Sequence, residues 1–180
     1  ATIPAAAGLT FSQITRGAGL GAQTAPDGIN GDGWSDGTSA ATALTANNYF
    51  QLTVTGNATT AFNVSGFNLG YRRSGTGPIN IQLYYSVNGG PFATFGSTYT
   101  TNTANTANTF HSASFTPGLP VAVPAGENIV IRITAWGASS AGGCGWRRDR
   151  WRTQDALRRD AAHRPGGAGH ARRDPRHAGA

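Results

Sequence analysis

Alternation of apolar and polar side chains is clearest between residues 79 and 87, which read Ile-Asn-Ile-Gln-Leu-Tyr-Tyr-Ser-Val. The odd positions are apolar or aromatic, and the even positions can face water. Successive side chains of a β-strand point to opposite sides of a sheet, so this pattern predicts a strand with one buried face. Asn88-Gly89-Gly90 follows and predicts a tight hairpin turn, because Asn and Gly tolerate positive φ.

The same alternation predicts strands over residues 49–55 and 128–136. Weaker patterns raise the total to about eight strands and lie at residues 9–14, 62–71, 92–99, 109–116 and 121–123. Residues 16–48 are rich in Gly, Asp, Ala and Thr and are predicted to form a long loop. Short strands with turn signals between them are typical of two-layer all-β folds. We therefore expect an all-β, antiparallel β-sandwich of the jelly-roll type.

Composition supports an exported chain without helices. Charged residues make up 12% of the sequence, Gly is abundant with 26 residues, and Met is absent. Because the chain starts at Ala1, we expect either a mature product from which any signal peptide has been removed or a trimmed form of a longer chain. No apolar run approaches the roughly 20 residues that cross a bilayer, so no transmembrane segment is expected. We expect an extracellular or cell-surface location. Cys144 is the single cysteine, which excludes an internal disulfide.

The net charge of +6 belongs to the C-terminal end of the chain. Residues 1–144 hold four Arg and four acidic residues, whereas residues 145–180 hold ten Arg and four Asp. We therefore expect a β-sandwich domain over residues 1–143 and an Arg/Ala/Gly-rich tail over residues 144–180. Two interpretations of the tail stay open. It is either a native basic tail, irregular or partly helical over 155–163 and otherwise disordered, or the product of a reading-frame change in a GC-rich gene.

Within this tail, residues 146–152 read Trp-Arg-Arg-Asp-Arg-Trp-Arg and mix arginine with aromatic side chains. Nucleic-acid-binding segments share that mixture. Four Asp residues dilute the charge, however, and no recognition motif accompanies it. We expect no specific nucleic-acid partner.

Three segments carry a resemblance to a known group of domains: residues 71–78 (Tyr-Arg-Arg-Ser-Gly-Thr-Gly-Pro), residues 85–90 (Tyr-Ser-Val-Asn-Gly-Gly) and residues 131–140 (Ile-Arg-Ile-Thr-Ala-Trp-Gly-Ala-Ser-Ser). Over residues 9–142 the chain resembles jelly-roll domains of secreted or surface-anchored bacterial proteins, which often end in PEP-CTERM-type sorting signals. The resemblance implies a sandwich similar to carbohydrate-binding modules. Such relatives continue after the Gly-Ala-Ser-Ser turn into a further strand, which we expect to be absent here.

The loop at residues 27–36 gathers oxygen-bearing side chains in a Gly-rich stretch, namely Asp27, Asn30, Asp32 and Asp36. Ca²⁺ takes shells of about 6–8 oxygen ligands, so this loop is a candidate calcium site, and Ca²⁺ is the one cofactor that the sequence suggests. The alternative is a turn-rich loop in which Asp and Asn side chains cap their own backbone and Trp34 lies in the core.

Sugar binding needs aromatic faces and planar polar groups at the surface. Tyr84 and Trp136 fall on the polar side of their strands, Arg72 and Arg73 lie beside a strand, and Trp34 stands in the long loop. We expect these five residues to contact a glycan or another cell-surface polymer. The predicted function is thus a non-catalytic, exported glycan-binding or adhesive module.

Two other functions remain as alternatives. The first is a structural subunit of a surface layer, matrix or filament that self-associates through sheet edges. The second is a hydrolase, whose acid–base chemistry would need two carboxylates facing one bond. Outside residues 27–36, the predicted sandwich offers Glu127 as its one carboxylate, so we expect no enzyme.

Overall fold

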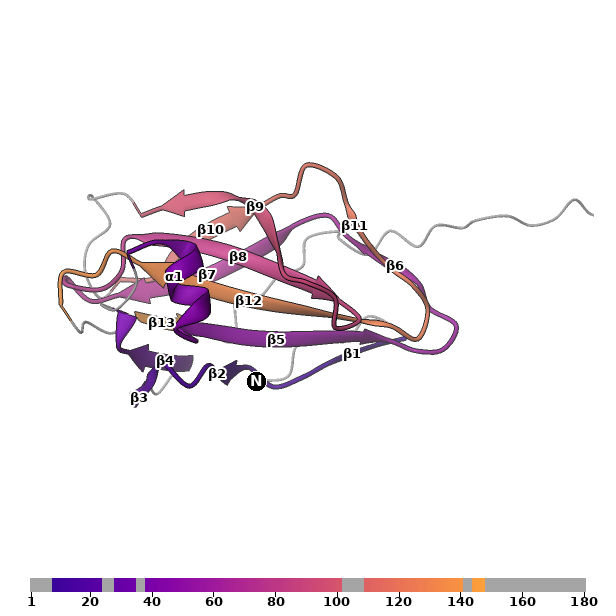
Figure 1. The fold of residues 1–180 in the computed structure, drawn as a ribbon, viewed down its shortest axis with the longest axis horizontal. Helices are drawn as coiled ribbons and strands as arrows, with labels where there is room; N and C mark the ends of the chain where they lie inside the picture. Colours follow the sequence, from indigo (N-terminus) through magenta and orange to yellow (C-terminus); the bar gives the residue numbers. More distant parts are fainter. Residues whose placement is uncertain (1–7, 24–27, 35–37, 102–108, 141–143, 148–180) are drawn as a thin grey trace, which may run out of the picture.

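The computed structural model describes residues 8–23, 28–34, 38–101, 109–140 and 144–147. These ranges form a six-stranded sheet, a five-stranded sheet, a two-stranded pair and one short helix (Figure 1). Each strand pairing among them is antiparallel. The predicted fold class, an all-β antiparallel sandwich, is confirmed.

The first sheet has the order β1-β5-β12-β8-β9, and β2 pairs with β5 beside β1. Its strands are β1 (Leu9–Phe11), β2 (Thr15–Arg16), β5 (Tyr49–Gly56), β8 (Asn80–Val87), β9 (Ala93–Thr100) and β12 (Asn128–Trp136). The segment with the clearest alternation is β8, an interior strand that pairs with β12 and β9. Its turn into β9 has positive φ at Asn88 (47°) and Gly89 (73°), as the sequence predicts for a tight hairpin.

The second sheet has the order β10-β7-β13-β4-β3. Its strands are β3 (Gly21–Gln23), β4 (Gly28–Asp32), β7 (Phe67–Arg73), β10 (His111–Phe115) and β13 (Cys144–Arg147). A separate pair consists of β6 (Phe62–Val64) and β11 (Val121–Val123). The chain passes directly from one sheet to the other between β2 and β3, β4 and β5, β7 and β8, β9 and β10, and β12 and β13. This exchange of strands ties the two layers together.

Strand β13 differs from the sequence-based expectation that no strand follows residue 140. Cys144 pairs with Arg73 of β7 on one side and with Gly31 of β4 on the other, so β13 lies inside the second sheet. The sequence of this strand shows no alternation of apolar and polar residues. Backbone hydrogen bonds to its two neighbouring strands hold it in the sheet. The second sheet therefore extends at least to Arg147. The rest of the predicted tail, 148–180, lies outside the described residues.

The prediction of a long loop over residues 16–48 is also wrong. It contains β3, β4 and a helix, α1 (Ala40–Thr45), between the ends of β2 and β5. The strands have three to five residues and contain Gly and Asn, so they carry little hydrophobic alternation. Ser39 begins the helix as its N-cap, because its side-chain oxygen accepts a hydrogen bond from the backbone N–H of Thr42 (3.2 Å).

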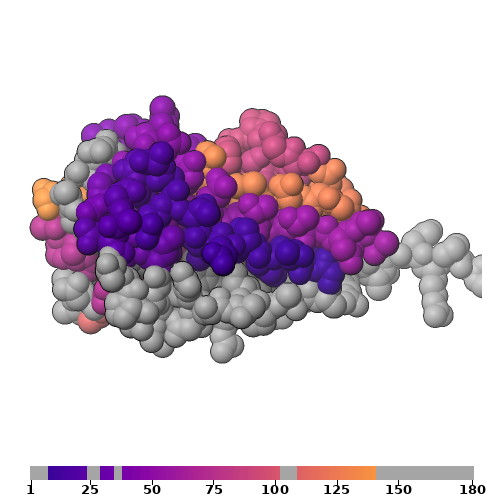
Figure 2. Space-filling view, turned by 90° about the horizontal axis from the view of Figure 1, so that it is seen from below, coloured from indigo at the N-terminus to yellow at the C-terminus, as the bar shows by residue number. Residues whose placement is uncertain are grey.

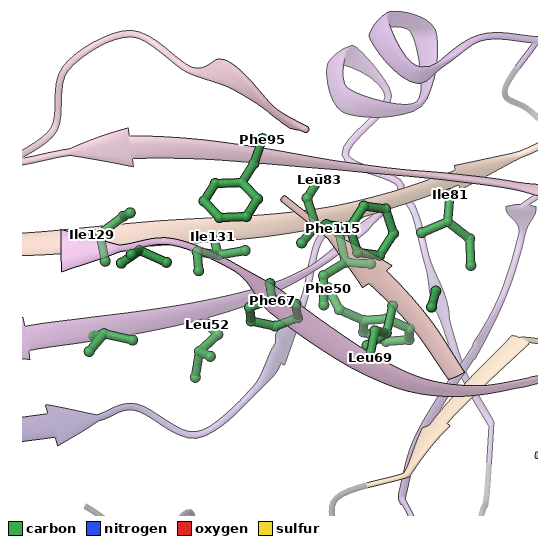
Figure 3. Close-up of a cluster of buried hydrophobic side chains, with 14 of the residues drawn as sticks. Phe50, Leu52, Phe67, Leu69, Ile81, Leu83, Phe95, Phe115, Ile129 and Ile131 are labelled. Carbon is green, nitrogen blue, oxygen red and sulfur yellow. The ribbon is translucent and has the colours of Figure 1, made fainter. Parts of the chain in front are cut away.

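The core lies between the two sheets, where their apolar side chains point toward one another (Figure 3). Leu83 and Ile131 come from the first sheet, and Leu69 and Phe115 come from the second; all four are at most 2% exposed. Each such buried side chain stabilises the fold by about 1.5–3 kcal/mol. The odd-numbered residues of 79–87, predicted to form the buried face, thus lie on the core side of β8. Ile79 is the exception, because it precedes β8 and is 40% exposed.

Candidate functional site

The outer face of the first sheet carries the side chains that alternate with the core residues of β5, β8 and β12. Tyr84 of β8 pairs in register with Arg132 of β12, and Asn80 pairs with Trp136. Because Leu83 and Ile133 on the opposite face are fully buried, Tyr84, Arg132 and Trp136 all face away from the core. The sequence predicts this shared orientation for Tyr84 and Trp136, and the register confirms it.

Arg132 stands at the centre of this face against two aromatic rings. Its guanidinium carbon lies 4.2 Å from the ring centre of Tyr49 and 4.1 Å from that of Phe92. Its Nε donates a hydrogen bond to Oε1 of Gln51, its partner in register on β5 (2.9 Å). A guanidinium over a ring face is attracted by the ring quadrupole, so these contacts hold the Arg132 side chain in place.

We call Tyr49, Gln51, Tyr84, Phe92 and Arg132 together the Arg132 cluster. Tyr84 belongs to it through the register, since side chains directly opposite on paired strands lie about 4.5–5.5 Å apart at Cβ. Tyr84 is half-buried, and burial raises the pKa of its phenol above the ordinary 10.0. The hydroxyl therefore stays protonated at neutral pH and can donate a hydrogen bond.

Helix α1 limits this face at one end, where it packs against β12 (Figure 1). Thr134 and Gln82 point outward yet are buried there. Their polar atoms bond within the protein: Thr134 Oγ1 donates to the carbonyl of Gln82 (3.0 Å), and Gln82 Nε2 donates to the carbonyl of Gly96 (3.1 Å). These two residues are thus structural, and a ligand would meet the neighbouring part of the face.

The shape of this face is visible in Figure 2, where its profile forms the upper border of the molecule. The surface dips between the purple segment that contains α1 and the pink segment of β9. Orange residues of β12, the strand that carries Arg132, lie at the bottom of the dip. In this profile the face is lowest between α1 and β9.

The five residues predicted to contact a ligand do not form one site. Trp34 is fully buried, stacks edge-on against Phe50 (5.4 Å between ring centres) and donates from its indole N–H to the carbonyl of Gly31 (2.9 Å). It is a core residue and presents no ring to a ligand. For a tryptophan in a loop, the sequence alone does not distinguish a buried ring from an exposed one.

Arg72 and Arg73 end strand β7 of the second sheet, away from the Arg132 cluster. The Arg72 guanidinium carbon lies 5.5 Å from the ring centre of Phe110. Arg73 Nη1 lies 3.3–3.5 Å from the carbonyl oxygens of Ser74, Gly75 and Gly77, so it braces the loop that leads into β8. Tyr84 and Trp136 remain as the predicted residues that share the outer face.

Of the four predicted calcium ligands, Asp27 and Asp36 lie outside the described residues. Asn30 and Asp32 are on β4, where each has a protein partner. Asn30 Oδ1 accepts from the backbone N–H of Gly31 (3.1 Å), and Asp32 Oδ2 accepts from Nε2 of Gln23 (2.5 Å). Among the described residues, no group of three His, Cys, Asp or Glu side chains could hold a metal ion. The calcium site stays a prediction.

Arg132, Gln51 and Phe92 were not predicted as site residues. The alternation of β5 places Tyr49 on the polar side of its strand, but Tyr49 was not among the five predicted contact residues. One signal was present: Arg132 interrupts the run Ile129-Val-Ile-Arg-Ile on the same side of the strand as Trp136. A charged residue at an outward position of an otherwise apolar strand marks a candidate surface site. Its aromatic partners come from a strand start and a hairpin, and no sequence pattern connects them to it.

Within the described ranges, no helix reaches the length and apolar character that a bilayer crossing demands; α1 has six residues.

No protein-family model and no curated protein matches the chain. Distant similarity to solved structures exists. An isomalto-dextranase of Arthrobacter globiformis T6 complexed with panose is 15% identical, with a TM-score of 0.41 over 83% of this chain and 24% of that one. An exo-β-1,3-galactanase of Phanerochaete chrysosporium with galactose is 16% identical, with a TM-score of 0.35 over 79% and 30%.

The module TmCBM61, in complex with β-1,4-galactotriose, is 14% identical, with a TM-score of 0.28 over 78% of this chain and 83% of that one. This chain thus spans less than a third of the length of the two enzymes and most of the length of the module. At TM-scores below 0.5, none of these similarities bears on what this chain binds.

Proposed function

We propose that this chain is a non-catalytic carbohydrate-binding module and that the Arg132 cluster is its binding surface. One observation carries the proposal: the Arg132 guanidinium lies about equally close to the rings of Tyr49 and Phe92, on the outer face of a sheet. Most polar side chains on such a face would simply be solvated. Here an arginine, two rings, an amide and a phenol are gathered around one point.

These groups match the two kinds of surface that a sugar presents. The C–H faces of a sugar ring pack on aromatic faces, and the half-buried Phe92 can offer one; Tyr49 is 9% exposed and contributes by holding Arg132. The hydroxyls of a sugar bond to planar polar groups with fixed directions. Gln51 supplies an amide whose Oε1 is engaged by Arg132, which leaves its NH₂ directed to other acceptors. Tyr84 supplies a protonated hydroxyl. The outer face of a sheet suits a polymeric glycan that lies across it, whereas small ligands usually occupy deeper pockets.

The positions of the described carboxylates favour binding without catalysis. Glu127 lies in the turn before β12 of the first sheet, and Asp32 lies on β4 of the second. Glycoside hydrolysis of the common type uses two carboxyl groups about 5–9.5 Å apart on either side of the scissile bond. Neither residue belongs to the Arg132 cluster. A glycan-binding role also accounts for the expected extracellular or cell-surface location, where polymeric glycans occur.

A glycan array probed with the full 180-residue chain tests this function. We expect binding to a subset of glycans, with at least about tenfold loss in an Arg132→Gln, Tyr84→Ala double variant, since each lost polar contact weakens binding. Arg72→Gln is the matched control, because it removes the same charge from the other sheet. The proposal fails if the wild-type chain binds no glycan, or if the double variant binds as well as the wild type.

One observation supports a structural subunit as a second candidate function. Strand β9 is an edge of the first sheet, eight residues long, and its sequence Ala-Thr-Phe-Gly-Ser-Thr-Tyr-Thr contains no charge and no proline. Natural edge strands usually carry such residues to prevent pairing with another chain. Light scattering across a concentration series distinguishes the candidates: a subunit assembles into large particles, whereas a binding module stays at constant mass.

A further inference from the structure

Arg132 is the one charged side chain at the outward positions of the interior strands β5, β8 and β12. The other outward residues on these strands are uncharged: Tyr49, Gln51, Thr53, Thr55, Asn80, Gln82, Tyr84, Ser86, Asn128, Val130, Thr134 and Trp136. Glu127 lies five residues before Arg132, which is about 17 Å along an extended strand. In the described part of the chain, Arg132 contacts an amide oxygen and two rings, and no carboxylate pairs with it. Among the described residues, its charge is therefore uncompensated on this face.

The contacts of Arg132 leave a defined part of its guanidinium available. The group has five N–H donors in one plane. Nε donates to Gln51, and no described residue accepts a hydrogen bond from the Nη atoms. The rings of Tyr49 and Phe92 lie close to the guanidinium carbon. The end of the fork is thus held in place, and no described residue uses its donors; this is the geometry that receives the two oxygens of a carboxylate.

We infer that this face selects acidic glycans and that Arg132 pairs with the carboxylate of a uronic acid residue. The inference rests on the proposed function, because it names the class of sugar that the same surface binds. A neutral sugar would offer Arg132 hydroxyl oxygens, whereas a uronate offers a charged acceptor of matching shape. Hydrogen bonds to an ionised acceptor are about twice as strong as neutral ones.

Tyr84 strengthens the same preference. It lies opposite Arg132 in register, and its protonated hydroxyl can donate to the carboxylate or to a neighbouring sugar oxygen. A phenolate at this place would repel the carboxylate, and burial raises the pKa of Tyr84, which keeps the phenol neutral. The site thus offers a cation and a neutral donor side by side.

The test compares two ligands with the same sugar units: trigalacturonate, whose carboxyl groups are ionised, and its fully methyl-esterified form, whose carboxyl groups are neutral. Isothermal titration calorimetry with the full-length chain measures both affinities. Short oligosaccharides are chosen because the ten arginines of residues 145–180 attract any long polyanion. We expect the wild type to bind trigalacturonate at least about tenfold more tightly than the ester, as a charge-assisted bidentate pair implies.

Three variants locate the effect. Arg132→Gln should bind trigalacturonate no better than the ester, and Arg132→Lys, which keeps the charge without the fork, should lie between it and the wild type. Arg72→Gln should behave like the wild type, because it removes an equal charge from the second sheet. Circular dichroism of each variant verifies the fold, and Arg132→Lys still tests the inference if Arg132→Gln does not fold.

The possible failures are distinguishable. Equal wild-type affinity for the two ligands overturns the acidic preference and leaves glycan binding intact. Equal losses in Arg132→Gln and Arg72→Gln overturn the role of Arg132, because the attraction is then one of net charge. A wild-type chain that binds neither ligand but binds neutral glycans on the array also overturns the inference alone. Absence of all glycan binding overturns the proposed function, and the inference with it.

Discussion

The guanidinium carbon of Arg132 lies 4.2 Å from the ring centre of Tyr49, although the two residues stand on different strands. Their strands pair so that Thr134 faces Tyr49 and Arg132 faces Gln51. Tyr49 is therefore the diagonal neighbour of Arg132, two positions away, which is within reach of long and aromatic side chains. The register of β5 and β12 thus decides that these two side chains meet.

A double-mutant cycle should detect this contact. We expect Arg132→Gln and Tyr49→Leu to couple by about 0.5–1 kcal/mol in the free energy of unfolding, the usual strength of a cation–π pair at a partly exposed site. Urea denaturation of the wild type, both single variants and the double variant measures the coupling. Arg132→Gln combined with Leu119→Ala, at an 82% exposed position, is the control and should be additive. Additive effects in the first cycle would contradict the contact.

Leu83 should be among the positions most sensitive to a charge. It is fully buried on β8 between the two sheets, so Leu83→Asp would place an unpaired carboxylate in the core. We expect a loss of more than about 4 kcal/mol, enough to unfold a domain of ordinary stability. Thermal unfolding followed by circular dichroism measures it.

Thr94→Asp on the neighbouring strand β9 is the control for Leu83→Asp, since Thr94 is exposed and pairs in register with Tyr84. A surface substitution of this kind changes stability by about 0.5 kcal/mol or less. A soluble Leu83→Asp variant that unfolds cooperatively near the wild-type temperature would show that this face of β8 is not core.

The strands that the sequence predicts well are the three interior strands of the first sheet. Predicted over 49–55, 79–87 and 128–136, they are observed as Tyr49–Gly56, Asn80–Val87 and Asn128–Trp136. Each has one face in the core and one outside, so burial imposes a period of two on the sequence. Strands β3, β4 and β13 have three to five residues, too few for that period to appear.

The candidate site was less predictable than the strands. Alternation assigns Tyr84 and Trp136 to the outer face, but it does not show that α1 packs on the same face and buries Thr134. Nor does it show which sheet a residue belongs to, so Arg72 and Tyr84 were grouped although they lie in different sheets. Contacts such as Arg132 with Phe92 depend on where the β8–β9 hairpin places Phe92 relative to β12, which local sequence does not encode.

Alkaline pH should destabilise the protein through Tyr84. Burial raises the pKa of the folded-state phenol above 10.0, whereas the unfolded chain titrates near 10.0. Between these two values the folded protein holds a proton that the unfolded chain has lost. The contribution of Tyr84 to the free energy of unfolding is therefore fully present below pH 10, and it is lost as the pH rises through the folded-state pKa.

Two measurements test the role of Tyr84. Absorbance at the phenolate band, compared between the wild type and Tyr84→Phe, should assign a transition above pH 10 to this residue. The urea midpoint should then fall more between pH 9 and pH 11 in the wild type than in Tyr84→Phe, in which this phenol is absent. Equal falls would mean that Tyr84 titrates alike in both states.

Strand β13 should tolerate loss of a backbone donor poorly. Gly145 pairs with Arg72 on one side and Asn30 on the other, so it lies at an interior position of the second sheet. Gly145→Pro removes the N–H and should cost about 3 kcal/mol or more. Gly145→Ala keeps the N–H and is the matched control. Urea denaturation compares the two, and a proline variant as stable as the alanine variant would contradict the placement of β13.

Two glycines, one in β9 and one in the turn before it, allow the effect of close backbone contact on stability to be separated from the effect of positive φ. Gly96 and Gly89 have nearly equal positive φ, 72° and 73°. A Cβ on Gly96 would meet the carbonyl oxygen of Thr116 at 2.8 Å, whereas a Cβ on Gly89 would meet nothing within 4 Å. Ala at either site pays the left-handed strain of about 1–2 kcal/mol. At Gly96 it also forces the backbones apart.

We therefore expect Gly96→Ala to be less stable than Gly89→Ala by at least about 1 kcal/mol, the lower range for forced backbone shifts in packed regions. Chemical denaturation of the two variants measures the difference, in which the strain common to both cancels. Gly96 lies on β9 and Thr116 directly follows β10, so the difference reports how closely the two sheets approach at this edge. Equal stabilities would mean that the edge opens without cost, and β9 would then be free to pair with another chain, as the structural-subunit alternative requires.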